Sequence, residues 1–383
     1  MTIIGVVFAF FSLELLFRLY HYVTDNKYFG LKPVRTTIVW QDDSVLGSRL
    51  IPNQKGWFVP HTKEYFTWIE VNSHGWPDVE HAFEKPEGTY RILFLGDSFV
   101  ENTQVPLEKR FFRQVEARLR DSSARQVEVI ATGQGNTGTA QQLVSLTNFG
   151  LKYKPDLVIQ MFLTANDVRN NSQTLQNDPY QPYYKVDEQD QLMPLPPKMH
   201  KERRLSGAKE FLKQFRVVEL LLTIRQKLME REKTTAFGYP IEYHVYDQEY
   251  SEEYDNAWEI TKKLILETKK QVEEAGAKYI LVTLSNNEQV HSDVWSEALE
   301  TYPQMKNVQF NLEKPDKILA DFCLEQSITC FQMLPLYKEY VASHQNERTH
   351  NRYEGHWNQA GTDLAAAFLG EVIQKSLSES SSD

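Results

Sequence analysis

The chain is predicted to be an α/β protein built on a mostly parallel sheet with helices on both faces. Short apolar segments bounded by turn residues alternate along the chain with segments of helical pattern. Such apolar segments are typical of strands that are covered on both faces, as in parallel sheets. Because crossovers between parallel strands are right-handed, we expect a doubly wound order.

Two sets of segments carry this prediction. The expected strands are Ile92–Leu95, Val127–Ala131, Asp156–Leu163, Lys278–Leu284 and Ile328–Met333. The expected helices are Glu108–Arg120, Thr139–Tyr153, Pro315–Gln326 and Asn358–Ser376. Residues 24–88 are instead rich in aromatics, Pro, Gly and turn formers, and they alternate like short strands. They predict a β-rich N-terminal extension before a main domain of residues 89–376.

An insertion at about residues 171–255 interrupts the alternation of strands and helices. It holds a polar, Pro-rich section and then Gly207–Glu232, whose apolar residues are spaced for one face of a long helix. That helix packs on the domain, forms a lid over a site, or rests on a membrane. The last residues, 377–383, are expected to be a disordered tail.

The N-terminus is almost wholly apolar from Ile3 to Phe17. This stretch is short for a membrane span, and no clear cleavage site follows it, so residues 1–23 predict an uncleaved membrane anchor. A docked amphipathic helix is the alternative. The nearest basic residues follow the segment, which by itself would keep the body of the chain cytoplasmic.

Composition excludes several classes of function. The net charge is −10 and the basic residues are scattered, which argues against nucleic-acid binding. The two cysteines, Cys323 and Cys330, have no metal-ligand spacing, so no zinc site is expected. We expect them to be buried thiols, with pairing open if their backbones lie close.

The candidate chemical groups follow the strands or precede the last helix. Ser98 leaves the first strand, a Gly-rich turn (Thr132–Thr139) leaves the second, and Asn166 follows the third. His356 precedes the last helix, with Glu354 two residues before it. A serine, a neutral imidazole that takes its proton, and N–H groups facing an oxyanion are what acyl transfer needs. Each residue also has a plain structural reading, as a helix cap, turn residue, core histidine or surface charge.

Four blocks in this order resemble the GDSL-type SGNH hydrolases, over about residues 88–375. They read GDSF, TGQGNTGT, AND and GHWNQAG. The blocks NSHG, VPLEK and LKYKPDLV are similar to those of the membrane-anchored bacterial members. The resemblance implies a three-layer α/β/α flavodoxin-like fold. It also implies a catalytic domain outside the cytoplasm, against the charge count, so sidedness stays open.

The resemblance implies a role for each matching residue. Ser98 matches the nucleophile, His356 the base and Glu354 the acid, although the family commonly has Asp there. The oxyanion hole would consist of the Ser98 and Gly135 backbone N–H groups and the Asn166 side chain, with Asn136 as the alternative to Gly135. Asp97 is expected to brace the turn. No cofactor or metal is implied.

The sequence therefore predicts a serine esterase that cleaves an ester on a glycan, a lipid or a small alcohol. One alternative is an O-acyltransferase acting on a cell-envelope polysaccharide, with Tyr180–Tyr184 as a wall of the acceptor groove. The other is a binding protein whose site has degenerated, since Glu354 and Ala165 depart from the family pattern. The expected partners are the ester substrate and the membrane.

Overall fold

A computed structural model describes residues 2–24, 36–122, 126–199, 215–218, 220–222, 224–225, 238–345 and 347–379. The chain forms two compact units. One unit, the N-terminal unit, comprises residues 1–35 and 200–241, and the other, the sheet unit, comprises residues 36–199 and 242–383. Every candidate site residue lies in the sheet unit.

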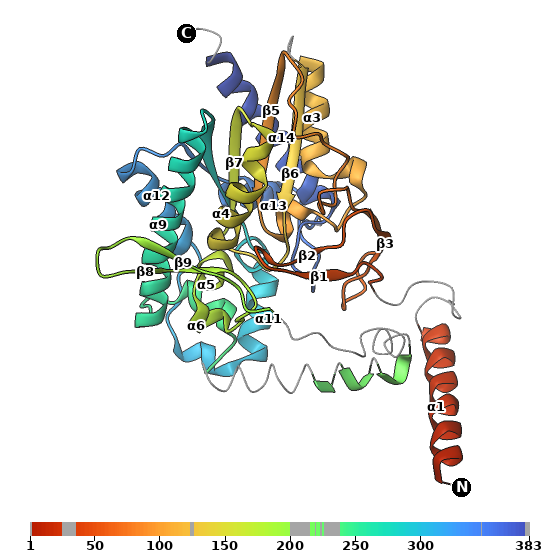
Figure 1. Cartoon of the computed structure of the whole chain (residues 1–383). Coiled ribbons are helices and arrows are strands. Elements are labelled where there is room, and N and C mark those ends of the chain that lie inside the picture. Colours follow the sequence, from red (N-terminus) through yellow and green to blue (C-terminus); the bar gives the residue numbers. More distant parts are fainter. Residues whose placement is uncertain are drawn as a thin grey trace. The chain divides into compact units, whose positions relative to one another are not determined.

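The sheet unit is built on a five-stranded sheet of order β11-β10-β7-β5-β6, with every pairing parallel. Figure 1 labels three neighbouring strands of this sheet, β7, β5 and β6. The strands are β5 (Thr89–Gly96), β6 (Gln126–Gly133), β7 (Leu157–Leu163), β10 (Lys278–Leu284) and β11 (Cys330–Gln332). Counted along the chain, this is the flavodoxin-like order 2-1-3-4-5. The predicted fold class and all the predicted strands are confirmed.

Helices cover both faces of the sheet, which is why its strands are apolar throughout. The side chains of Ile92, Leu93, Phe94 and Leu95 in β5 are all 0% exposed. Those of Ile92 and Phe94 join a core cluster with α3 (Phe111–Ser122) and α14 (Gln359–Glu379). α4 (Thr139–Asn148) and α9 (Glu252–Glu274) pack against each other through a separate apolar cluster. Apolar burial on both faces thus fixes the three layers.

Two predicted helices are shorter than the sequence pattern suggested. The segment from Glu108 begins as a 3₁₀ turn, η1 (Leu107–Lys109), and Arg110 is extended, so α3 starts only at Phe111. The segment Thr139–Tyr153 divides at Phe149 into α4 and the 3₁₀ helix η2 (Gly150–Tyr153). α12 (Lys314–Glu325) lies within one residue of its prediction.

Further short elements complete the sheet unit. They are α2 (Ser98–Glu101), α5 (Asp167–Asn170), α6 (Gln173–Gln176), η3 (Ile241–Tyr246), α10 (Asn287–Val290), α11 (Ser292–Thr301), η4 (Pro303–Asn307) and α13 (Leu334–Ser343). α9 and α13 were not predicted. α9 is the crossover between β7 and β10, so the regular alternation resumes at Glu252.

The N-terminal extension holds two antiparallel hairpins, as its alternation predicted. They are β1 (Trp40–Asp43) with β2 (Gly47–Leu50), and β3 (Lys55–Phe58) with β4 (Thr67–Glu70). A third hairpin, β8 (Tyr183–Val186) with β9 (Leu192–Leu195), lies in the predicted insertion. The predicted disordered tail is wrong as far as Glu379, because α14 continues and Leu377 packs against the core. Residues 380–383 lie outside the described residues.

The N-terminal unit contains α1 (Thr2–Thr24). Within this unit the Glu14 carboxylate pairs with Arg18 and accepts the backbone N–H of Val217. Residues 216–218, 220–222 and 224–225 are helical, Phe215 lies in a bend, and the other residues of the predicted helix Gly207–Glu232 lie outside the described residues. Among the helices of the described part of the chain, none has the length and apolar content needed to cross a membrane.

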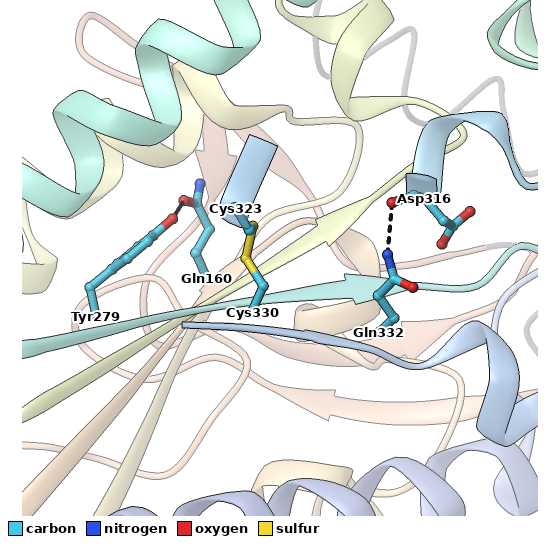
Figure 2. Close-up of a disulfide and its surroundings, with 6 residues drawn as sticks. All are labelled: Gln160, Tyr279, Asp316, Cys323, Cys330 and Gln332. Carbon is cyan, nitrogen blue, oxygen red and sulfur yellow. Dashed lines mark hydrogen bonds between the residues drawn. A yellow bond between two sulfur atoms is a disulfide. The ribbon is translucent and has the colours of Figure 1, made fainter. Parts of the chain in front are cut away.

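Cys323 and Cys330 form a disulfide, so the expectation of two buried thiols is wrong. Their Cα atoms are 6.2 Å apart because α12 ends close to the start of β11. Figure 2 shows the bond joining the helix to this edge strand. In the same view the side chain of Gln332 donates to the backbone carbonyl of Asp316, a second link between β11 and α12.

Arg91 links the extension to the sheet. Its side chain, 1% exposed, donates to Glu128 of β6 and to four backbone carbonyls. Three of these carbonyls, Ala82, Phe83 and Glu84, belong to the extension, and the fourth is that of Tyr153. The guanidinium therefore satisfies buried acceptors from three separate segments.

We expect Arg91→Ala to lower the free energy of unfolding by about 3–5 kcal/mol, because it leaves a carboxylate and several carbonyls without their donor. Urea denaturation measures the change. The matched control is Lys55→Ala, which removes a solvent-exposed ion pair with Glu70 and should have a much smaller effect. Equal losses in the two variants would contradict this role of Arg91.

Candidate active site

Ser98 lies at the carboxyl end of β5, on the turn that enters α2. The side chain of Asp97 caps this turn by accepting the backbone N–H of Phe99, which agrees with the predicted bracing role. Gly133, at the end of β6, allows α2 to lie against that strand. A Cβ atom on Gly133 would come within 2.2 Å of the backbone nitrogen of Glu101. The turn is thus held closely, and Ser98 itself remains partly exposed.

The structure brings His356 to Ser98. The Oγ of Ser98 lies 2.5 Å from Nε2 of His356. His356 sits on the turn before α14, where its carbonyl accepts the backbone N–H of Asn351, and its ring packs against Phe99 at 4.8 Å between centroids. The two side chains are within hydrogen-bond distance, as a nucleophile and its base must be.

Glu354 lies on the other side of the imidazole. Its Oε1 is 2.6 Å from Nδ1 of His356, so the longer side chain reaches the ring from two residues away. Burial opposes charge on both groups, but their mutual attraction prevails. The pKa of Glu354 is lowered and the pKa of His356 is raised. A carboxylate in this place fixes the ring and favours its protonated form.

The extension supplies two residues that the sequence analysis missed. The Tyr65 hydroxyl donates to Oε1 of Glu354 at 3.0 Å. The carboxylate of Glu64 accepts the backbone N–H groups of Tyr353 and Glu354. Both residues position the acid rather than touching His356. No sequence signal could have found them, because the partners are 289 or more residues apart.

The candidate oxyanion groups line the same cleft. Gly135 and Asn166 follow β6 and β7, and both are partly exposed. The Asn166 side chain opposes the rise in the pKa of the Asp97 carboxyl group, and its Oδ1 has no partner among the described residues. Asn136, the alternative to Gly135, has a φ of 60° and is exposed. Asn102, in place of the usual glycine, has a φ of 47° that Asn tolerates.

Buried carboxyl groups surround the turn. Burial raises the pKa of Asp97 to about 6 and that of Asp167 well above its usual range. Glu101 is 6% exposed, and burial raises its pKa to about 7. Glu101 was not among the predicted site residues, although a residue three positions after Ser98 on a helix lies on the same face as the serine.

Other histidines lie away from this arrangement. His344 is exposed at the C-terminal end of α13, whereas His350 is 1% exposed. His350 packs among Phe99, Tyr337 and His291, and burial lowers its pKa to about 3. Among the described residues no group of side chains is arranged to hold a metal ion.

The cleft has a volume of about 590 Å³. Its lining adds aromatic and amide side chains to the groups already named: Trp40, Phe58, Gln104, Asn136, Asn286 and Asn287. The predicted wall Tyr180–Tyr184 is not among the lining residues. The arrangement offers a serine, a base with its acid, and N–H donors to a carbonyl compound bound from solvent.

No model of a known protein family matches the chain, and no curated protein matches its sequence. Several solved structures are similar to it. A lipase/acylhydrolase from Enterococcus faecalis is 14% identical, with 75% of this chain and 96% of that chain covered and a TM-score of 0.38. An acetyl xylan esterase is 10% identical, with 74% and 99% covered and a TM-score of 0.41. A putative acylhydrolase from Bacteroides fragilis is 13% identical, with 77% and 90% covered and a TM-score of 0.36.

We expect Glu354→Gln to lower the pKa of His356, because the carboxylate is the nearest group that stabilises the imidazolium. Titration of the imidazole by NMR in the full chain measures the shift. Glu347→Gln, which changes a carboxylate paired with Tyr340 outside the cleft, is the control. An unchanged pKa of His356 in Glu354→Gln would contradict the pairing.

Proposed function

We propose that the chain is a serine esterase of the SGNH type. The observation that carries this proposal is the continuous contact from Ser98 Oγ through the His356 ring to Glu354 Oε1, at the edge of a cleft open to solvent. The sheet order and the four residue blocks support the same assignment.

In the proposed reaction, the Oγ of Ser98 attacks the ester carbonyl carbon while its proton passes to Nε2 of His356. The carbon–oxygen bond to the alcohol breaks, and the imidazolium gives its proton to the departing alkoxide. Water then attacks the acyl-serine, with its proton taken by His356. The carbon–Oγ bond breaks, Oγ recovers a proton, and the free acid leaves. Glu354 stabilises the imidazolium in each half of the cycle.

The donors proposed for the oxyanion are the backbone N–H groups of Ser98 and Gly135 and the side chain of Asn166. They come from the carboxyl ends of three neighbouring strands, where open α/β sheets bind their ligands. Asn166 lines the cleft and is partly exposed, so its amide is accessible to a bound substrate.

The lining of the cleft favours an acyl group carried on a glycan over one carried on a lipid. Trp40 is 40% exposed, and its ring packs edge-on against Phe58 at 6.3 Å. An exposed aromatic face suits the C–H groups of a sugar ring.

A glycan hydroxyl in place of water would make the protein an O-acyltransferase, and the same aromatic rim favours an acceptor of this kind. A degenerate binding site is less well supported, since the serine and histidine lie within hydrogen-bond distance.

The proposed location is a membrane surface facing an oxidising compartment. The disulfide Cys323–Cys330 supports the compartment, because such bonds are rare in the reducing cytosol. Large apolar side chains exposed along α1, among them Ile4, Phe8, Phe11, Leu16 and Val23, support attachment of this helix to lipid.

We expect the full chain to hydrolyse p-nitrophenyl acetate and Ser98→Ala to lose this activity. Asn166→Ala should lower kcat by roughly 10²–10³ with a smaller effect on KM, since the amide acts mainly in the transition state. Asn148→Ala, which changes an exposed amide at the end of α4, is the control. Equal rates for wild type and Ser98→Ala would contradict the esterase. Turnover that appears only when a glycan with free hydroxyl groups is added as acceptor would identify the transferase.

The compartment has its own test. Cys323 and Cys330 are the two cysteines of the chain, so alkylation reports on this pair alone. We expect mass spectrometry of the protein from its native membranes to show no alkylated cysteine before reduction and two afterwards. Alkylation without a reductant would contradict an oxidising location.

A further inference from the structure

Glu101 is an acidic group in the cleft that the proposed reaction does not use. It lies on α2, one turn beyond Ser98, and lines the cleft together with Ser98, Gly135 and His356. Its side chain is nearly buried, unlike the partly exposed serine and histidine. A carboxyl group so close to a serine nucleophile needs an explanation, because burying its charge is costly.

The carboxyl group of Glu101 lies beside Gly135, whose backbone N–H favours the ionised form of the acid. The space beside the Gly135 Cα atom shows how close the two residues lie. A Cβ atom there would lie 3.3 Å from Oε2 of Glu101 and 3.8 Å from Cβ of Ser98. The Glu101 carboxyl group therefore lies beside the glycine whose N–H the proposed function assigns to the oxyanion.

An ionised Glu101 conflicts with the proposed reaction. The tetrahedral intermediate places a negative oxygen where Gly135 donates, and a carboxylate beside that N–H would compete for it. Two negative charges a few ångströms apart in a partly desolvated site repel strongly. A protonated carboxyl group removes the repulsion and adds an O–H donor.

Building on the proposed esterase reaction, we propose that Glu101 belongs to the oxyanion hole and carries a proton when the oxyanion forms. In this form its O–H faces the substrate oxygen beside the Gly135 N–H. Ionised Glu101 instead occupies the Gly135 N–H and inhibits the site. Glu101 is then a catalytic residue that also sets the upper pH limit of the reaction.

The charged and titratable groups around Glu101 come from four segments. Asp97 on the same turn opposes its ionisation, while Arg110 before α3 and His356 before α14 favour it, and Tyr65 of the extension also faces it. Burial is the largest influence, and it raises the pKa of Glu101 to about 7. Both forms are therefore populated near neutral pH.

The proposal predicts that kcat/KM falls on both sides of an optimum pH. As pH rises past the pKa of Glu101, the carboxylate forms and kcat/KM falls. As pH falls through the pKa of His356, the base is protonated and kcat/KM falls again. Because the charge of Glu101 raises the pKa of His356, neutralising Glu101 should also move the acid limb to lower pH.

The test is the pH profile of kcat/KM for p-nitrophenyl acetate in the full chain, with the Ser98→Ala rate subtracted at each pH. We expect the wild type to lose roughly tenfold per pH unit above the pKa of Glu101, since one proton is lost. Glu101→Gln should abolish this alkaline limb and move the acid limb to lower pH. Glu108→Gln, the same change at an exposed position on η1, should keep the wild-type profile.

Three outcomes would overturn the inference. One is an alkaline limb that persists unchanged in Glu101→Gln, and another is a folded Glu101→Gln that is inactive at every pH. If Glu101→Gln does not fold, Glu101→Ala takes its place. This variant should also lose the alkaline limb, and its maximal kcat/KM should be lower because the O–H donor is gone. An alkaline limb retained in Glu101→Ala is the third contradicting outcome. Equal rates for wild type and Ser98→Ala would instead remove the esterase proposal itself, and this inference with it.

Discussion

The contact between Ser98 and His356 is the constraint on which the rest of the site depends. It joins residues 258 positions apart, at the first strand of the sheet and before the last helix. On one side, Gly133 lets α2 approach β6 and so places the serine. On the other side, the backbone of Asn351 holds the histidine turn. The sheet order places the carboxyl ends of β5, β6 and β7 side by side, and the histidine turn lies at this end of the sheet.

Several carboxyl groups lie near the carboxyl ends of the strands. Their surroundings decide which of them are ionised and which carry a proton. Glu354 stays ionised because an imidazole and the Tyr65 hydroxyl contact it. Glu101 and Asp167 lie where burial outweighs any nearby cation, so their pKa values rise. A carboxyl group thus serves as the ionised partner of the base at Glu354 and as a neutral acid at Glu101. The surroundings of each group set its role.

Sequence reasoning succeeded where the evidence is local and failed where contacts are distant. The five strands were predictable because apolar runs between turns report burial on both faces. The positions of Ser98, Asn166 and His356 at strand ends or before a helix could be read from short motifs. The contributions of Glu64 and Tyr65 could not, because they come from an extension far away in the sequence. The disulfide was missed for a related reason, since pairing depends on how α12 meets β11.

Reaction with a fluorophosphonate probe tests the central claim most directly, because it requires an activated serine but no knowledge of the substrate. The phosphorus atom bonds to Ser98 Oγ with loss of fluoride, while His356 takes the proton. The account predicts one adduct per chain, located on Ser98 by peptide mass spectrometry and absent from His356→Ala. An unlabelled wild-type chain, or an adduct on a different serine, would contradict it.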